Sequence, residues 1–421
     1  MLSVQAAQDE TRAEKPIIGL ALAGGGPIGG IYELGALLAL DEALDGMDLN
    51  NLDIYVGVSS GSFVASTLVN QVSTDEMYGI FVRNDPAEHL FSPDTFLKPA
   101  FMEYFSRMMS LPELFTDALE RYLTHPDDLG LLESMGHLGR ALPTGIFDNE
   151  KINLFLEHLF SKPGRSNDFR QLKHRLFVVA VDLNTSQAVI FGADEHSHIP
   201  ISKAVQASAA LPGLYPPVEI EERYYVDGAL RKTIHASAAL EAGVDLLFCV
   251  NPLVPFDANF VNADPGHARP EMNNLINGGL PVVLSQTFRT LIYSRMRVGM
   301  SKYRSQYPTA DIVLFEPNPN DARMFFTNVF SFSNRRRICE HAYQTTRREL
   351  YANRQQLEPL LARHGIGLRL DRLEDETRHI GDVLQSNLSL PDRTENLVGI
   401  LQYAHEVLDL LEHRVQFQQK P

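Results

Sequence analysis

The sequence predicts an α/β protein with a central, mainly parallel sheet flanked by helices. A short apolar run at 17–23 ends at a glycine cluster, and apolar residues at helical spacing follow across 30–44. A second apolar run at 53–58 ends at a serine and leads into small residues that suit a helix packed closely on a sheet. Strand-length apolar runs resume at 175–181 and 188–191. Alternating strands and helices of this kind are typical of a doubly wound parallel sheet.

Three further strands are expected at 223–226, 245–250 and 311–315. Between about 81 and 145 the strand pattern stops, and a helical insertion rich in Phe, Leu and Met is expected instead. The remainder of the chain, 321–421, is charged and helical in pattern.

The expected organisation therefore has three parts. Residues 1–15 form a disordered polar arm, 16–320 form the main α/β domain with its insertion, and 321–421 form a helical C-terminal region.

Composition limits the classes of partner. The chain of 421 residues has 37 basic and 53 acidic residues, a formal charge of −16, which argues against nucleic acid as a partner. It does not exclude contact with a membrane, because a local basic patch can act within an acidic protein. The N-terminus lacks a secretory signal pattern, and no apolar stretch reaches the roughly 18 residues of a membrane span. We expect a cytoplasmic protein that can also contact a membrane peripherally.

The segment Gly57-Val58-Ser59-Ser60-Gly61 fits G-x-S-x-G. In a nucleophile elbow of this pattern, the serine occupies a strained turn between a strand and a helix, and the flanking glycines avoid clashes. The motif alone is weak, because short glycine-containing patterns arise by chance. Its position between an apolar strand and a small-residue helix makes Ser59 the candidate nucleophile.

A glycine cluster, Gly24-Gly25-Gly26 followed by Gly29, lies between the first strand and the first helix. Glycines leave backbone amides uncovered, and a helix N-terminus attracts negative charge, so the loop suits an oxyanion. The same residues also satisfy the dinucleotide-binding pattern G-x-G-x-x-G. That alternative expects an acidic residue at the end of the second strand, where this chain has Ser59 instead.

Asp227 and Gly228 follow the expected strand at 223–226. A serine hydroxyl is a poor nucleophile until a neighbouring base takes its proton, and a carboxylate within hydrogen-bond reach can do so. An Asp-Gly pair is most often only a turn, so this candidate depends on the two earlier motifs.

These motifs in this order, together with the segment ASAALPGLYPP at 207–217, resemble the patatin-like phospholipase family. The likeness covers roughly 15–255. It implies that Ser59 is the nucleophile, that Asp227 is its partner in a dyad without histidine, and that the Gly24–Gly26 loop supplies the oxyanion hole through the amides of Gly25 and Gly26. One departure is Ile28, because the family usually has Lys or Arg at that position.

A Ser-His-Asp arrangement is the nearest mechanistic alternative, with His235, His267 or His341 as the histidine. Against it, Ser59 comes very early in the chain and no histidine precedes the glycine loop.

Two stretches could contact lipid. The insertion contains a crowd of apolar side chains, which suits either a helical cap with its own core or an acyl-chain groove. The stretch 289–304 mixes five basic residues with apolar ones, and Phe325, Phe326, Phe330 and Phe332 precede Arg335–Arg337. Basic groups beside aromatics suit an anionic membrane, although helices with a solvated charged face give the same pattern.

The expected function is hydrolysis of carboxylic esters in lipids, of the phospholipase A or lysophospholipase type, with no cofactor and no metal site. Two alternatives stay open. The same dyad could serve an acyltransferase or a polyester depolymerase, or the chain could be a weakly active protein that binds lipid or membrane.

Overall fold

The computed structural model describes residues 1–7, 15–83, 144–145, 147–257, 275–276, 279–319, 321 and 332–385. Contacts divide the chain into two units, Met1–Thr377 and Arg378–Pro421. The second unit has one described helix, α16 (Ile380–Gln385). All other elements belong to the first unit, which contains every predicted site residue.

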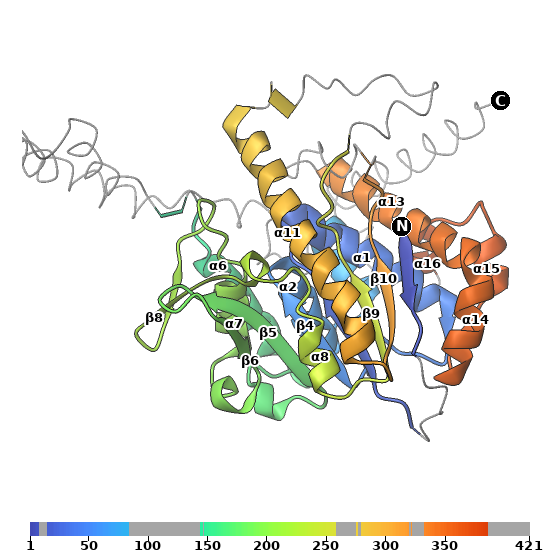
Figure 1. The fold of residues 1–421 in the computed structure, drawn as a ribbon, viewed down its shortest axis with the longest axis horizontal. Coiled ribbons are helices and arrows are strands. Elements are labelled where there is room, and N and C mark those ends of the chain that lie inside the picture. Colours follow the sequence, from blue (N-terminus) through green and yellow to red (C-terminus); the bar gives the residue numbers. More distant parts are fainter. Residues whose placement is uncertain are drawn as a thin grey trace, which may run out of the picture. The chain divides into compact units, whose positions relative to one another are not determined.

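The first unit is built on a nine-stranded sheet with the order β1-β10-β9-β2-β4-β5-β8-β7, and β6 pairs with β5 (Figure 1). Its five central strands are parallel, which confirms the predicted fold class. They are β10 (Asp311–Phe315), β9 (Leu246–Val250), β2 (Ile18–Leu22), β4 (Ile54–Val58) and β5 (Arg175–Asp182). The antiparallel strands are β1 (Leu2–Gln5), β6 (Ala188–Phe191), β7 (Val218–Ile220) and β8 (Arg223–Asp227).

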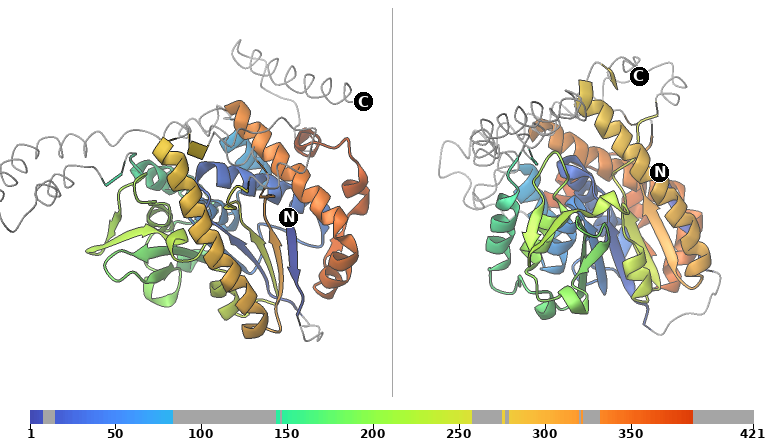
Figure 2. Two further views of the ribbon diagram at one scale, coloured as in Figure 1. Left: turned by 45° about the horizontal axis from the view of Figure 1, so that its top comes forward. Right: turned by 60° about the vertical axis from the view of Figure 1, so that its left-hand side comes forward.

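Helices cover both faces of the sheet because the strand order reverses at β2. From β2 to β4 to β5 the chain moves in one direction, and from β9 to β10 it moves in the other. Right-handed crossovers therefore place α1 (Gly26–Ala43) and α2 (Ser60–Val69) on one face, and α11 (Gly279–Gln306) on the opposite face (Figure 2). Ligands of such sheets bind at the carboxyl ends of the strands beside the reversal point. Both predicted glycine motifs lie at that edge.

The remaining elements of the first unit are mostly helical. The helices are α3 (Thr74–Tyr78), α6 (Glu150–Phe160), α7 (Ile201–Ser208), α8 (Ser237–Glu241), α13 (Phe332–Ala352), α14 (Arg354–Arg363) and α15 (Leu370–Glu374), with a π-helical turn at Gly79–Arg83. Short 3₁₀ turns occupy Phe169–Gln171, Asp194–His196 and Gly228–Leu230, and a two-stranded sheet pairs β3 (Leu44–Asp45) with β11 (Gly367–Leu368). No helix in these described stretches has both the length and the apolar character needed to cross a membrane.

Helix α13 packs directly on α1, although nearly 300 residues separate them in sequence. The two helices approach closely at Gly35, where an added Cβ would lie 2.2 Å from the carbonyl oxygen of Cys339. The C-terminal region is helical, as predicted. Its predicted start at residue 321 differs from the contact-based division, which falls after Thr377, because an amphipathic sequence does not reveal which helix it will pack against.

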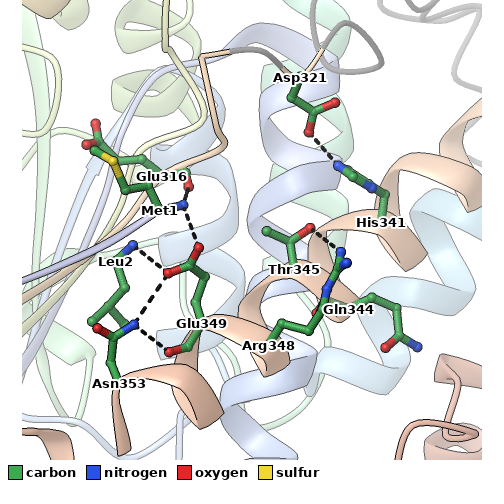
Figure 3. Close-up of polar contacts among 10 residues, drawn as sticks. All are labelled: Met1, Leu2, Glu316, Asp321, His341, Gln344, Thr345, Arg348, Glu349 and Asn353. Carbon is green, nitrogen blue, oxygen red and sulfur yellow. Dashed lines mark hydrogen bonds and ion pairs between the residues drawn. The ribbon is translucent and has the colours of Figure 1, made fainter. Parts of the chain in front are cut away.

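The prediction of a disordered arm at residues 1–15 is wrong for its first part. Leu2–Gln5 form β1, which pairs with the edge of β10. The Leu2 amide also donates to Glu349 of α13 at 3.0 Å, and the Met1 ammonium lies 3.5 Å from the same carboxylate (Figure 3). These partners are distant in sequence, so a short polar segment gave no sign of them. Residues 8–14 lie outside the described part.

All seven predicted strands are present within about two residues of their expected bounds. Residues 84–143 of the predicted insertion at about 81–145 lie outside the described part of the chain. The apolar side chains considered for lipid contact belong to these residues.

Candidate active site

Ser59 lies between the end of β4 and the first residue of α2, in a left-handed conformation with φ of 52°. Non-glycine residues rarely adopt this conformation, and in a strand-to-helix turn it directs the side chain beyond the end of the strand. Ser59 is buried at this position. The flanking glycines are needed for space. An added Cβ at Gly57 would lie 2.3 Å from Ser62 Cα, and one at Gly61 would lie 2.4 Å from the carbonyl oxygen of Leu22.

Strand register brings Asp227 to the same level as Ser59. In the parallel pair β4–β5, Val58 is opposite Val179, and in the antiparallel pair β5–β8, Ala180 is opposite Asp227. Ser59 follows Val58, so both residues lie level with the small residue Ala180. The Ser59 hydroxyl is close enough to the Asp227 carboxyl to lower the pKa of that carboxyl.

Asp227 is buried, and its surroundings change its acidity. Burial raises the pKa of this carboxyl to about 6, and the hydrogen bonds from the Ser59 side chain and the Ala229 amide oppose that rise. The Ala229 amide lies 2.8 Å from Asp227 Oδ1. The carboxylate is thus ionised at neutral pH but holds a proton more tightly than an exposed aspartate, which favours proton acceptance. At Gly228, an added Cβ would lie 2.2 Å from the Val179 carbonyl, so only glycine fits there.

The glycine loop lies against Ser59 and against Ala229, two residues after Asp227. An added Cβ at Gly24 would lie 3.0 Å from Ser59 Cβ and 3.1 Å from Ala229 Cβ. The Gly24 amide donates to the Thr233 carbonyl at 3.4 Å, whereas the amides of Gly25 and Gly26 donate to no acceptor within the described residues. Gly25 caps α1 without a side-chain hydrogen bond, which leaves this helix N-terminus open to an anion.

The glycine loop also packs closely on a residue that follows the neighbouring strand β9. Added Cβ atoms at Gly25 and Gly29 would lie 2.5 Å and 3.0 Å from Pro252 Cγ, just past the end of β9. Ile28, where the family usually has a basic residue, is half-buried in the first turn of α1.

Ser208 and Ala210 bind the backbone amides of Ser59 and Asp227. The Ser208 hydroxyl accepts a hydrogen bond from the Ser59 amide at 2.8 Å and donates one to the Val179 carbonyl at 2.6 Å. The Asp227 amide donates to the Ala210 carbonyl at 3.0 Å. The sequence indicated this segment only as a family-like stretch. Its partners lie on other strands, so no local pattern could have identified the role.

The hydroxyl of Ser60 is a further feature that sequence reasoning missed. Its oxygen is buried and has no hydrogen-bond partner among the described residues. Ser60 is the first residue of α2, and its hydroxyl oxygen faces the glycine loop, 3.4 Å from the position of an added Cβ at Gly29. A buried donor without a partner next to an oxyanion loop is available to a bound substrate.

The histidine alternative finds little support in the geometry. His235 Nε2 donates to the Gly228 carbonyl at 3.3 Å rather than to Asp227, and burial lowers its pKa to about 4, so it is neutral. His341 binds Asp321, and His267 lies outside the described residues. Within the described residues, no cluster of His, Cys, Asp or Glu could hold a metal ion.

A doubly wound α/β sheet with a serine on a strand-to-helix elbow is the arrangement of α/β serine hydrolases, and this is the general class that the fold and the site indicate. Its sequence matches the family model described as patatin-like phospholipase over residues 20–240, more than half of the chain. The chain therefore belongs to the patatin-like phospholipase family.

Individual relatives are distant. The chain is 28% identical over 217 residues to the uncharacterized protein R571 of Acanthamoeba polyphaga mimivirus, a match that covers 51% of this chain and 59% of that protein. Among solved structures, VipD from Legionella pneumophila is 13% identical with a TM-score of 0.28, covering 100% of this chain and 91% of VipD. ExoU of Pseudomonas aeruginosa, solved in complex with SpcU, is 14% identical with a TM-score of 0.28, covering 74% of this chain and 60% of that chain. The assignment to the family therefore rests on the family model and not on these structures.

Proposed function

We propose that this protein is a serine acyl hydrolase that cleaves carboxylic esters of lipids through a Ser59–Asp227 dyad. Membership of the patatin-like phospholipase family supports a lipid hydrolase. The single observation that carries the more specific proposal is the position of the Ser59 hydroxyl, on its strand-to-helix turn, beside the buried carboxylate of Asp227.

In the first step, Asp227 accepts the Ser59 hydroxyl proton while Ser59 Oγ bonds to the acyl carbon. The carbonyl electron pair moves onto the oxygen, which faces the amides of Gly25 and Gly26. When the intermediate collapses, the bond to the alcohol breaks, and the leaving oxygen takes the proton from Asp227. Water then repeats the sequence on the acyl-enzyme, which releases the fatty acid and restores Ser59.

The surroundings of the dyad favour this chemistry. The N-termini of α1 and α2 both begin at the site, and their dipoles stabilise negative charge there. An oxyanion-hole donor typically contributes a factor of about 10²–10³ to kcat. A carboxylate with a pKa of about 6 also matches a base that works near neutral pH.

The direct test measures hydrolysis of a p-nitrophenyl ester by the wild type and by Ser59→Ala and Asp227→Asn. Labelling by a fluorophosphonate probe is followed in parallel. Ser66→Ala is the matched control, because Ser66 lies on the same helix and its hydroxyl binds only the Phe63 carbonyl among the described residues. We expect both dyad variants to lose activity by orders of magnitude while the control keeps it.

Adding an alcohol acceptor to the same assay separates hydrolysis from acyl transfer by the products formed. An inert wild type whose Ser59 takes no label would contradict the proposal and favour a lipid-binding protein without turnover.

A further inference from the structure

Helix α11 presents two different apolar faces. On its inner face, Ile292, Met296, Met300 and Tyr303 are buried in the same core cluster as the sheet residues Ala21 and Cys249. Their spacing of three or four residues places them on one side of the helix. This face fixes α11 to the sheet and leaves its opposite side facing outward (Figures 1 and 2).

One flank of the exposed side is also apolar, whereas Thr287, Ser294 and Ser301 occupy its middle. Leu284, Phe288, Leu291 and Val298 follow at intervals of four, three and seven residues, so they form one row along the helix. Each side chain is exposed, Leu291 to 56% and Val298 to 55%. Single exposed apolar residues are ordinary, but an aligned row over four turns of one helix marks a contact surface.

The charge on α11 is the reverse of the charge on the whole chain. The helix has no acidic residue among its 28, whereas the chain carries a formal charge of −16. It has five basic residues, of which Arg295, Arg297, Lys302 and Arg304 are exposed. Arg295 follows Leu291 by four residues and Lys302 follows Val298 by four, so both lie in the apolar row, whereas Arg297 and Arg304 lie on the other flank of the helix. An apolar row that contains cations and no anions is complementary to an anionic lipid surface.

This helix also contacts the loop that follows Asp227. Arg295 Nη1 donates to the Leu230 carbonyl at 3.2 Å, and the Thr233 hydroxyl donates to the Ile292 carbonyl at 3.4 Å. The Thr233 carbonyl in turn accepts from the Gly24 amide of the glycine loop. A surface bound to α11 therefore lies next to the loops that build the candidate site.

We propose that the apolar row of α11, defined by Leu284, Phe288, Leu291, Arg295, Val298 and Lys302, docks this protein on an anionic lipid bilayer. This docking deepens the proposed function, because it would bring the candidate site to a lipid substrate. The second basic segment from the sequence fits less well. Arg335 is buried within the first unit, so the Arg335–Arg337 cluster is not an exposed patch as a whole.

The test uses the full chain as Ser59→Ala, so that vesicles are bound without being consumed. Sedimentation with phosphatidylglycerol–phosphatidylcholine vesicles is compared with pure phosphatidylcholine. In this background we expect Phe288→Gln with Leu291→Gln to lower the affinity about tenfold or more. Lys302→Glu should lower it about threefold or more, and high salt should weaken binding of the parent.

Two controls match these changes elsewhere on the first unit. Leu183→Gln with Leu154→Gln removes two apolar side chains of similar exposure, and Lys173→Glu alters the net charge by the same amount at an exposed lysine. Both controls should bind like the parent. Unchanged binding by the α11 variants overturns the proposal. So does a dimeric parent that the α11 variants turn into a monomer, because a second copy would then cover this face.

Failure of the catalytic proposal gives a different pattern. If the α11 variants alone lose vesicle binding and the wild type cleaves no p-nitrophenyl ester, the docking surface stands and the hydrolase does not. If the wild type cleaves the soluble ester and the α11 variants retain that activity while vesicle binding is unaltered, the hydrolase stands and the docking surface does not.

Discussion

The hydroxyl of Ser208 accepts a hydrogen bond from the backbone amide of Ser59, at 2.8 Å, across 149 residues of sequence. This bond fixes the amide of a residue whose φ of 52° is intrinsically unfavourable. It also occupies the Ser59 amide, so an oxyanion must find its donors elsewhere, in the glycine loop. We therefore regard Ser208 as a residue that positions the nucleophile.

Replacing this hydroxyl tests the positioning role. We expect Ser208→Ala to lower kcat about 10- to 100-fold with a smaller change in KM, because Ser59 loses its orientation more than the substrate loses contacts. The stability should fall by about 1–3 kcal/mol, as for other lost buried hydrogen bonds. Ser202→Ala removes another buried hydroxyl from α7, one that binds Asn167 instead. It should cost stability without this loss of kcat; an equal loss in both variants would assign Ser208 a purely structural role.

The pH dependence of activity should follow Asp227. Its carboxylate must be ionised to accept the Ser59 proton, and burial raises its pKa to about 6. We expect kcat/KM to rise about tenfold per pH unit below 6 and to level off above it. Steady-state rates on a neutral soluble ester between about pH 4.5 and 8 give the profile. A profile without an inflection near pH 6 would remove Asp227 as the base.

Asp227 should also cost the protein stability at neutral pH. Its pKa is raised on folding, so the stability that its protonated form contributes is fully present below the unfolded pKa of 3.8 and is lost as the pH rises through about 6. Asp227→Asn keeps a side-chain oxygen for the Ala229 amide and carries no charge. We expect the free energy of unfolding of this variant to exceed that of the wild type by about 1–3 kcal/mol at pH 7, with no difference below pH 4.

Asp182 provides the comparison of opposite sign. Burial tends to raise the pKa of Asp182, but hydrogen bonds from Arg223 and two backbone amides outweigh it and hold that pKa below its usual value. The stability it contributes is present at neutral pH and lost as the pH falls. Asp182→Asn should therefore lower the melting temperature at pH 7, measured by calorimetry beside Asp227→Asn. Parallel shifts in the two variants would contradict the assignment.

The glycine loop allows a matched pair of substitutions. Gly24→Ala places a Cβ 3.0 Å from Ser59 Cβ, so the serine or the loop must move, and we expect activity to fall at least tenfold. Gly30→Ala adds the same atom within α1, where the nearest heavy atom is 3.5 Å away. That change should leave activity intact and add up to about 1 kcal/mol of stability. Steady-state kinetics of ester hydrolysis and thermal unfolding of both variants test these two expectations.

Much of the sheet could be predicted because its information is local. An apolar run that ends at the glycine cluster marked β2, and one that ends at Ser59 marked β4. The position of Asp227 at a strand end followed from the run at 223–226. The proximity of the Ser59 and Asp227 side chains did not follow, since it depends on β5 lying between β4 and β8.

What the sequence could not supply depends on distant partners. The polar segment at Leu2–Gln5 becomes a strand only because the β10 edge and Glu349 bind its backbone groups. Likewise, the hydroxyl of Ser208 looks like that of any small residue in a helix until the fold brings Val179 and Ser59 beside it.

The contact between α1 and α13 at Gly35 determines how the chain can be divided for experiments. The family-matched segment, residues 20–240, contains Ser59 and Asp227, so it is an obvious fragment to express. Such a truncation would remove β9, which pairs with β2 along its whole length, and would uncover the side of α1 that meets α13. The fragment would present an unpaired strand edge and a bare apolar helix, both of which promote aggregation. A failed assay of that fragment would therefore reflect the loss of β9 and α13. The proposed activity has to be assayed on a longer fragment that contains both elements.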